Sequence, residues 1–361
     1  MKIPFTKLHQ QYLDCKADID AAIADIIATS SFITGPYVDK FEKSMAEYLQ
    51  VDDCASTGSG TMSLVCALRA LGIGTGDEVL TTPHTFVSTT EAIVIVGATP
   101  VFVDIDPDTH LIDLDLLETK ITSLTRAVLF VDMYGQCPDL DRVREICTSH
   151  KLYMIEDAAH TLGAQWKNKP IGSQADITCF SFSPVKNLGA MGDAGCVTGS
   201  QELMSRVRMF RDHGRIDRYD IVEIGYNARI DNMQGAVVLA KLPKLADWVS
   251  RKREICNQYD QALNGIVKTI KRNSLVGQGH YVYVIQTAQR DELRNFLHDR
   301  GIQTNIHYAT TTNLQPAYAK WYTPCPVAEK TVSEILSLPC YYSLTQQEIN
   351  YIIDSIKDFF Q

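Results

Sequence analysis

The chain has 361 residues, which is long enough for a large domain with a smaller one beside it. Hydrophobic residues make up 45% of it and charged residues 21%, as in ordinary globular proteins. The net charge of −9 argues against a nucleic-acid-binding protein, although it leaves room for a local basic site that binds a small phosphate.

The ten cysteines form no Cys-x-x-Cys pair, and the nine histidines show no spacing typical of a metal site. We therefore expect reduced thiols and no bound metal. The first residues run into a polar stretch without the apolar core of a signal peptide, and the longest apolar run, 92–98, is too short to cross a bilayer. These features predict a cytoplasmic protein with neither nucleic acid nor membrane as a partner.

From about residue 52 to 197, helical stretches alternate with short runs rich in β-branched residues, which predicts an α/β domain with a largely parallel sheet. The predicted strands are 78–81, 101–104, 127–131, 153–156, 177–180 and 195–198, and the predicted helices are 61–71, 140–150 and 202–210. Ligands of such sheets usually bind at the carboxyl ends of the strands.

After Asp231 the sequence predicts one long helical passage to about residue 264, bent near Pro243. Strands at 281–287 and 303–307 and helices at 290–300 and 346–360 then form a smaller α+β unit. We expect a large domain over 1–245 and a small C-terminal domain over 246–361 that pack tightly together.

Lys186 and Asp157 both follow apolar, strand-like runs, 29 residues apart. A lysine in an apolar pocket has a lowered pKa and can bond to an aldehyde, and an aspartate can keep a pyridine nitrogen protonated. Together they suggest a pyridoxal phosphate enzyme. For Asp157 the alternative is a helix cap for the residues from Ala158 onward.

Four further places in the sequence each have two interpretations. Ser59-Gly60-Thr61 precedes a helix and could bind phosphate with backbone amides and the Thr61 hydroxyl, or it could be a glycine turn capped by Thr61. Phe86 could stack on a flat cofactor or belong to the core. Asn227 and Arg229 could contact an anion, or they could cap the following helix and lie on the surface. His307-Tyr308, at the end of a predicted strand, could be catalytic or structural.

Taken together, these residues resemble the DegT/StrS family of sugar aminotransferases, which have the aspartate aminotransferase fold (fold type I). The resemblance covers essentially the whole chain, and its landmarks are Ser59-Gly60-Thr61, Gly76-Asp77-Glu78-Val79, Thr85-Phe86-Val87, Gly97 to Asp104, Tyr134-Gly135-Gln136, Glu156 to His160, Ser181 with Lys186, Gly225 to Arg229 and Ile306-His307-Tyr308.

The resemblance implies a role for each matching residue. Lys186 would bind pyridoxal phosphate covalently and act as the catalytic base, with pyridoxamine phosphate as the alternate form of the cofactor. Asp157 would face the pyridine nitrogen, and Phe86 would stack on the ring. The other implied contacts are Gly60, Thr61 and Ser181 with the phosphate, His160 near the phenolic oxygen, Asn227 across a homodimer interface, and Arg229, His307, Tyr308 and Asn313 on the substrate side.

The chain departs from the family pattern at His160, where glutamine is common, at Asn313, where many members have histidine, and mildly at Ala194 in the glycine-rich stretch. The implied reaction moves the amino group of L-glutamate to a 3-keto or 4-keto sugar linked to UDP or dTDP, for amino-sugar and surface-polysaccharide biosynthesis. Alternatives are a cyclitol-ketone aminotransferase, a sugar dehydratase, which Lys186 disfavours because those relatives carry histidine there, and a ligand sensor.

Overall fold

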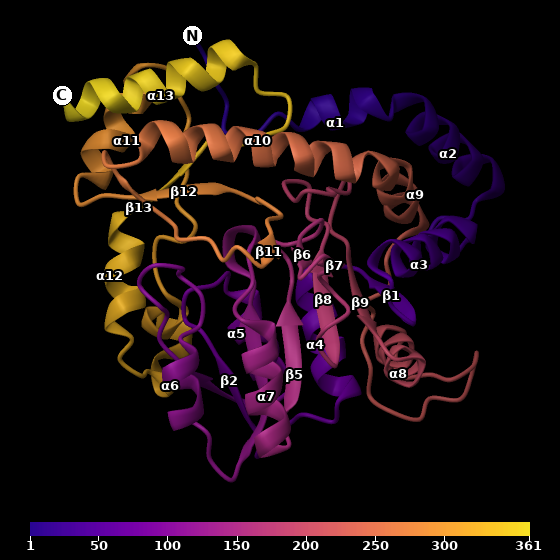
Figure 1. Cartoon of the computed structure of the whole chain (residues 1–361). Coiled ribbons are helices and arrows are strands. Elements are labelled where there is room, and N and C mark those ends of the chain that lie inside the picture. Colours follow the sequence, from indigo (N-terminus) through magenta and orange to yellow (C-terminus); the bar gives the residue numbers. More distant parts are fainter.

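The larger part of the protein is built on a seven-stranded sheet. A computed structural model describes the whole chain, Met1–Gln361 (Figure 1). Across the sheet the strands are β1 (Asp53–Thr57), β9 (Gly195–Gly199), β8 (Ile177–Ser181), β5 (Tyr153–Asp157), β4 (Thr125–Val131), β2 (Glu78–Thr81) and β3 (Thr99–Phe102). Only β9 runs antiparallel to its neighbours, so the predicted α/β class with a largely parallel sheet is confirmed.

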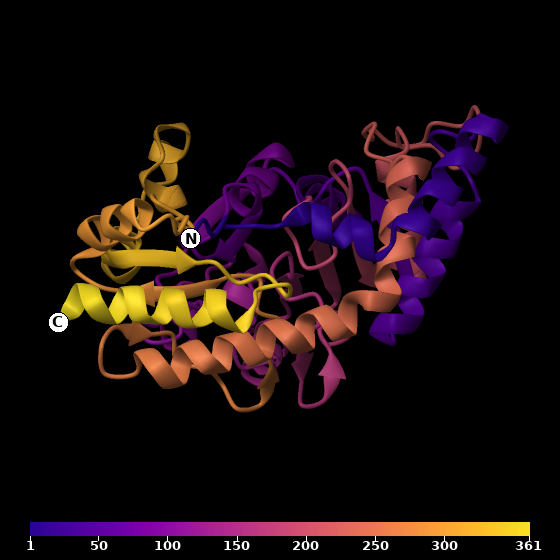
Figure 2. The same cartoon turned by 90° about the horizontal axis from the view of Figure 1, so that it is seen from above.

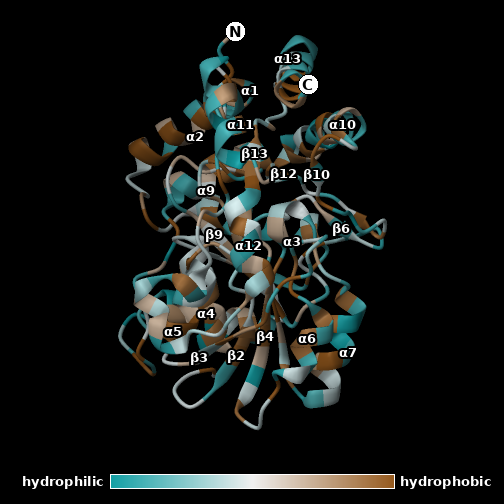
Figure 3. Ribbon diagram, turned by 90° about the vertical axis from the view of Figure 1, so that its left-hand side faces the viewer, coloured by the Kyte–Doolittle hydropathy of each residue, from teal (hydrophilic) through white to brown (hydrophobic).

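Helices cover both faces of this sheet. One face carries α4 (Gly60–Ala70), α5 (Ser88–Ile95) and α8 (Gln201–Arg211), and the other carries α3 (Pro36–Leu49), α6 (Leu114–Thr119) and α7 (Leu140–His150). Because both faces are buried, the central strand β4 is apolar almost throughout instead of alternating, and all its residues except Arg126 are buried. Apolar and polar residues alternate along α7 (Figure 3), and its apolar residues Leu140, Val143 and Ile146 are buried, whereas α4 has no exposed residue.

The N-terminal helices were not predicted from the sequence. They are α1 (Leu8–Asp14) and α2 (Lys16–Thr29), and with α3 they lead into β1, which was also missed. α2 and α3 pack against α9 (Asn232–Lys241), which lies far away from them in the sequence (Figure 2). Ile19 and Ile26 of α2 are fully buried in these contacts.

The helical passage after Asp231 is present as predicted. It consists of α9, a 3-10 turn η2 (Leu242–Lys244) at Pro243, and the long α10 (Leu245–Leu263). Proline lacks the N–H that a continuous helix needs, so the passage bends there. Figure 1 shows α10 crossing from the large sheet to the C-terminal elements.

The C-terminal elements form a second layer. Its antiparallel sheet has the order β10 (Lys268–Thr269), β12 (Tyr283–Gln286) and β13 (Ile335–Leu338), covered by α10, α11 (Arg290–Asp299) and α13 (Gln346–Phe360). The remaining elements are β6 (Gln165–Trp166), β7 (Lys169–Pro170), β11 (Val276–Gly277), α12 (Pro326–Glu334), η1 (Met133–Gly135), η3 (Thr312–Leu314) and η4 (Pro316–Trp321). The helices and the sheet of this layer enclose an apolar cluster that includes Ile3 and residues of α13, so the two ends of the chain meet there. The division at residue 245 stays a prediction.

The predicted strand 303–307 is wrong. Residues 303–306 make only an isolated antiparallel bridge, in which Asn305 pairs with Ser337 of β13. The segment instead passes beside the N-terminus, where the backbone N–H of Ile3 bonds to Gly301 and that of Gln303 bonds to Ile3. Gln303 therefore bonds to the N-terminal segment, and the single bridge at Asn305 is too short to count as a strand.

Candidate active site

A cavity of about 300 Å³ opens at the carboxyl ends of the parallel strands, next to the C-terminal layer. Its size and position are those of a small-molecule site. Asp157 is the last residue of β5 and Ser181 the last of β8, so both side chains meet at this edge. The cavity also collects the predicted residues Gly60, Thr61, Phe86, His160, Lys186, His307 and Tyr308.

Lys186 lies on a tight loop after β8. Its backbone N–H bonds to the Ser183 carbonyl at 2.9 Å, and the loop closes so tightly that a Cβ on Gly189 would lie 2.2 Å from the Pro184 carbonyl oxygen. The Lys186 amine lies 4.2 Å from the centroid of the Tyr281 ring. Burial lowers the pKa of Lys186 to about 7, against a smaller opposing effect of Asp157. A large share of this amine is therefore neutral, and nucleophilic, near neutral pH.

Asp157 is held by a short chain of hydroxyl groups. The Thr89 hydroxyl donates to Asp157 Oδ2 at 2.7 Å, and the Thr89 and Thr85 hydroxyls lie 2.7 Å apart. The Ala159 N–H donates to Asp157 Oδ1 at 3.2 Å, which orients the carboxylate, but residues 158–161 form a turn, so the predicted alternative of a helix cap is wrong. Burial raises the pKa of Asp157, and the Thr89 bond opposes this rise.

The N-terminus of α4 forms the polar end of the cavity. The cap is Ser59, whose side chain accepts from the Met62 N–H at 3.2 Å, so the alternative that placed Thr61 as the cap is wrong. The Thr61 hydroxyl instead lies 2.7 Å from that of Ser88. A Cβ on Gly60 would approach the Ser181 Cβ to 2.6 Å, so only glycine lets the backbone pass there. The first N–H groups of a helix have no intrahelical partner and favour an anion.

Aromatic side chains form the opposite wall. His160 stacks on Tyr281 with ring centroids 4.2 Å apart, and its Nε2 lies 3.3 Å from the Tyr308 hydroxyl. Burial lowers the pKa of His160, as it lowers that of His307 to about 4, so both rings are neutral at pH 7. Phe86 is 53% exposed and tilts against Tyr308, so the alternative that placed Phe86 in the core is wrong.

Three predicted residues lie elsewhere in the structure. Arg229 forms an ion pair with Asp212 and donates to the side-chain oxygen of Asn227 at 3.0 Å, and neither residue lines the cavity of its own chain. Asn313 is 1% exposed, and its amide nitrogen donates to the Thr323 carbonyl and to Glu329, each at 2.9 Å. The Asn313 side chain is therefore buried and hydrogen-bonded within the C-terminal part of the chain.

Several cavity residues were missed from the sequence. Thr85 and Thr89 lie one helical turn apart on either side of the start of α5, a spacing that could have revealed a shared face. Tyr281 reaches the site from the C-terminal layer, and no local signal marks it.

These residues fit pyridoxal phosphate by their chemistry. The cavity combines an amine with a pKa near 7, an oriented carboxylate, and a helix N-terminus lined by hydroxyl groups at which Gly60 leaves room that a Cβ would fill. These match the aldehyde, the ring nitrogen and the phosphate of the cofactor.

The sheet, the cavity and its lysine define an aminotransferase of fold type I. The profile of the DegT/DnrJ/EryC1/StrS aminotransferase family matches residues 14–357, and the chain belongs to this family. It is a pyridoxal-phosphate-dependent enzyme, as the resemblance implied.

Individual relatives match this chain over nearly their whole length. The chain is 36% identical to the dTDP-3-amino-3,4,6-trideoxy-alpha-D-glucose transaminase of Streptomyces venezuelae, covering 99% of this chain and 96% of that protein. It is 34% identical to the UDP-2-acetamido-2-deoxy-3-oxo-D-glucuronate aminotransferase of Pseudomonas aeruginosa, covering 97% and 98%. A protein of Geobacillus stearothermophilus named pleiotropic regulatory protein is 37% identical, covering 100% and 99%.

Solved structures share the fold closely. The structure of S. venezuelae DesV in complex with a ketimine intermediate has a TM-score of 0.97 at 36% identity, covering 100% of this chain and 99% of that one. NtdA of Bacillus subtilis, with the bound cofactor PMP, has a TM-score of 0.92 at 28% identity, covering 99% and 85%.

Proposed function

We propose that this enzyme moves the amino group of L-glutamate to a keto sugar linked to UDP or dTDP, acting at carbon 3 of the sugar. The observation that carries the proposal is the amine of Lys186, which lines the cavity with a pKa near 7 on the same side as Asp157. Support for the substrate class comes from relatives named for UDP- and dTDP-linked sugars, in which the 3-amino and 3-oxo positions recur.

Lys186 is the catalytic residue in this proposal. Pyridoxal phosphate, when bound, supplies an aldehyde that bonds to amines and a ring that withdraws electrons from the neighbouring carbon. Lys186 takes a proton from the α-carbon of glutamate, and in the second half of the reaction it returns a proton to the sugar carbon that carries the new amine. A pKa near 7 suits both directions of this transfer.

The other cavity residues bind and orient in this proposal. Asp157, held by Thr89, would keep the ring nitrogen protonated, and the N-terminus of α4 with Thr61 and Ser181 would hold the phosphate. Phe86 would stack on the ring, and His160 would contact its phenolic oxygen. His307 and Tyr308 would face the sugar. Asn313 has no such role here, because its amide is already bonded.

We further propose a homodimer in which Asn227 and Arg229 of one subunit complete the site of the other. Neither reaches the cavity of its own chain, and the loop that precedes them exposes Ile216 at 67%, Ile221 at 67% and Ile224 at 85%. Apolar side chains this exposed are unusual unless a partner covers them.

The proposed setting is cytoplasmic, in the biosynthesis of amino sugars for surface polysaccharides. No helix combines the length and apolar character needed to cross a membrane. We propose the division into domains 1–245 and 246–361 with the cavity between them, since Tyr281, His307 and Tyr308 come from the second part.

Mass spectrometry of reactions with L-glutamate and a panel of UDP- and dTDP-linked 3-keto and 4-keto sugars tests the substrate class. The expected result is an amino sugar from a 3-keto substrate together with 2-oxoglutarate, and an amine formed only at carbon 4 would contradict the choice of carbon. Turnover of cyclitol ketones but of no nucleotide sugar would favour the cyclitol alternative, and loss of the sugar hydroxyl without amination would favour a dehydratase. Purified protein without cofactor absorbance or turnover would favour a sensor.

A further inference from the structure

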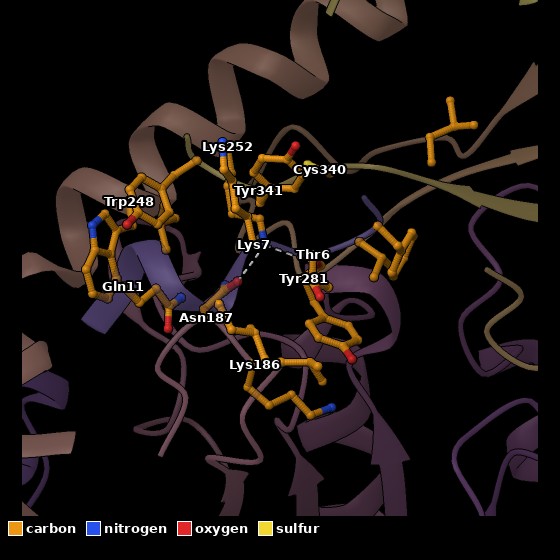
Figure 4. A pocket seen from close by; sticks show the side chains of 17 residues that line it. Thr6, Lys7, Gln11, Lys186, Asn187, Trp248, Lys252, Tyr281, Cys340 and Tyr341 are labelled. Atoms are coloured by element: carbon orange, nitrogen blue, oxygen red, sulfur yellow. Dashed lines mark hydrogen bonds between the residues drawn. The ribbon is translucent and has the colours of Figure 1, made fainter. Parts of the chain in front are cut away.

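A lysine on α10, Lys252, is buried directly behind the loop that carries Lys186. It is 7% exposed, and its amine donates to the side-chain oxygen of Asn187 at 2.8 Å and to the Tyr281 carbonyl at 2.9 Å. Lys252 lines a small cavity of about 50 Å³ between α10, the N-terminal segment and this loop; Figure 4 labels Lys252, Asn187, Tyr281 and Lys186 around it. Both bonds of Lys252 therefore end on residues that adjoin the active site.

Asn187, the residue after Lys186, connects Lys252 to two further segments of the chain through hydrogen bonds. Its amide nitrogen donates to the Leu162 carbonyl at 3.1 Å and to the Gly279 carbonyl at 2.6 Å. Leu162 follows His160 by two positions, and Gly279 precedes Tyr281 by two. The bond from Lys252 fixes the rotation of this amide, and with it the spacing between the loops that carry His160, Lys186 and Tyr281.

The second bond of Lys252 holds the residue that supports the catalytic amine. The Tyr281 ring lies 4.2 Å from the Lys186 amine and stacks on His160 at 4.2 Å. Holding the Tyr281 carbonyl limits movement of this ring. A displacement of about 1 Å at a reacting group can reduce the rate by about a hundredfold.

A second buried lysine acts on the same loop from the end of α9. Lys241 is 4% exposed, and its amine donates to the Gly189 carbonyl at 2.6 Å and, more weakly, to the Gln11 side chain at 3.5 Å. Burial lowers the pKa of Lys241 to about 8 and also lowers that of Lys252. All acceptors of the two amines are neutral.

Stability alone does not account for two buried lysines without carboxylate partners, because replacing buried charged groups with apolar side chains of similar volume is often neutral or stabilising. Their shared feature is the target, since both bind within residues 187–189, directly after Lys186. We infer that Lys241 and Lys252 are positioning residues that hold the Lys186 loop, and through Asn187 the His160 and Tyr281 loops, in the geometry needed for proton transfer. The inference rests on the proposed role of Lys186.

The test compares Lys252→Met and Lys241→Met with wild type. Hydrogen exchange of the cofactor-free protein should be faster by about tenfold or more in peptides covering 186–190 and 279–282, with α13 unchanged. With the cofactor bound, kcat should fall by about tenfold or more while KM for both substrates stays within about threefold, because the loss acts on geometry and not on binding. Lys252→Arg should keep the exchange rate and kcat close to those of wild type. Arginine retains hydrogen-bond donors, and the adjacent cavity has space for its larger side chain.

Lys244→Met is the matched control, because Lys244 lies on the same helical passage but is exposed. It should leave exchange and kcat unchanged. Folded Met variants with wild-type exchange and kcat would overturn the inference, as would faster exchange throughout the protein or a KM change equal to the change in kcat. If Lys252→Met does not fold, Lys241→Met provides the test, because the only short hydrogen bond that it loses is the one to Gly189. A wild-type enzyme inactive on the whole sugar panel would contradict the proposed function and leave the exchange result to stand.

Discussion

Replacing Thr89 with valine removes a hydroxyl group and changes almost nothing else. The two side chains have the same shape, and the only bonds that Thr89 makes through its side chain are to Asp157 Oδ2 and the Thr85 hydroxyl, each at 2.7 Å. Thr89 is 1% exposed, so the bond that it donates to Asp157 is buried. Asp157 keeps only the bond from the Ala159 N–H at 3.2 Å.

The expected magnitude follows from this geometry. A buried hydrogen bond to a charged group contributes about 1.5–3 kcal/mol, and here it stabilises the ionised form of Asp157. The direction is upward, because the Thr89 bond opposes the rise that burial causes. Since the ionised carboxylate is the form that binds a protonated ring nitrogen, affinity for pyridoxal phosphate should fall by about tenfold to a hundredfold at pH values below the pKa of Asp157.

Titration of the cofactor-free protein with pyridoxal phosphate across pH measures both effects. Affinity should be lost as pH falls through the pKa of Asp157, and in Thr89→Val this loss should occur at a higher pH than in wild type. Thr89→Ser, which keeps the hydroxyl, should resemble wild type. Thr90→Val is the control, since Thr90 is equally buried but bonds to Thr312 at 3.0 Å, away from Asp157. Unchanged affinity and pH dependence in Thr89→Val would refute the reasoning.

Three further predictions address the other parts of the site. Gly60→Ala should weaken phosphate binding by about tenfold or more, measured by the same titration, because its Cβ would lie 2.6 Å from the Ser181 Cβ; wild-type affinity would contradict the tight approach. Lys186→Ala should fold and abolish transamination, and in wild type the rate of covalent cofactor capture should rise with pH through about 7, because the neutral amine is the nucleophile. A rate of capture that rises only near the ordinary pKa of lysine would show that burial does not lower the pKa of Lys186. Lys186→Ala and Asn227→Ala chains, each inactive alone, should recover about a quarter of wild-type activity when they are mixed in equal amounts, because about half of the dimers are then mixed and each mixed dimer has one intact site. No recovery would contradict a shared site.

The fold class and the edge of the sheet at which the cavity lies could be predicted from the sequence because their signals are local. The buried parallel strands appear as apolar runs, and residues at their carboxyl ends, such as Asp157 and Ser181, must meet at one edge of the sheet. Pro243 marks the bend between α9 and α10 by itself, because proline cannot continue a helix.

The positions that were wrong or missed depend on contacts between distant segments. In the segment 303–307, Gln303 bonds to Ile3 and only Asn305 pairs with β13, so no strand forms there. Tyr281 enters the site only because the C-terminal layer folds over the large sheet. Phe86 is exposed, although the sequence around it is also compatible with a position in the hydrophobic core.

The sequence alone determined which groups meet at this site, namely the amine of Lys186, the carboxylate of Asp157 and the glycine turn at the start of α4. The tertiary structure decided how these groups are tuned. Burial lowers the pKa of Lys186, Thr89 orients Asp157, and Lys252 reaches from α10 to hold the loop after Lys186. Desolvation and hydrogen bonding depend on which segments pack together, and no local pattern in the chain encodes that packing.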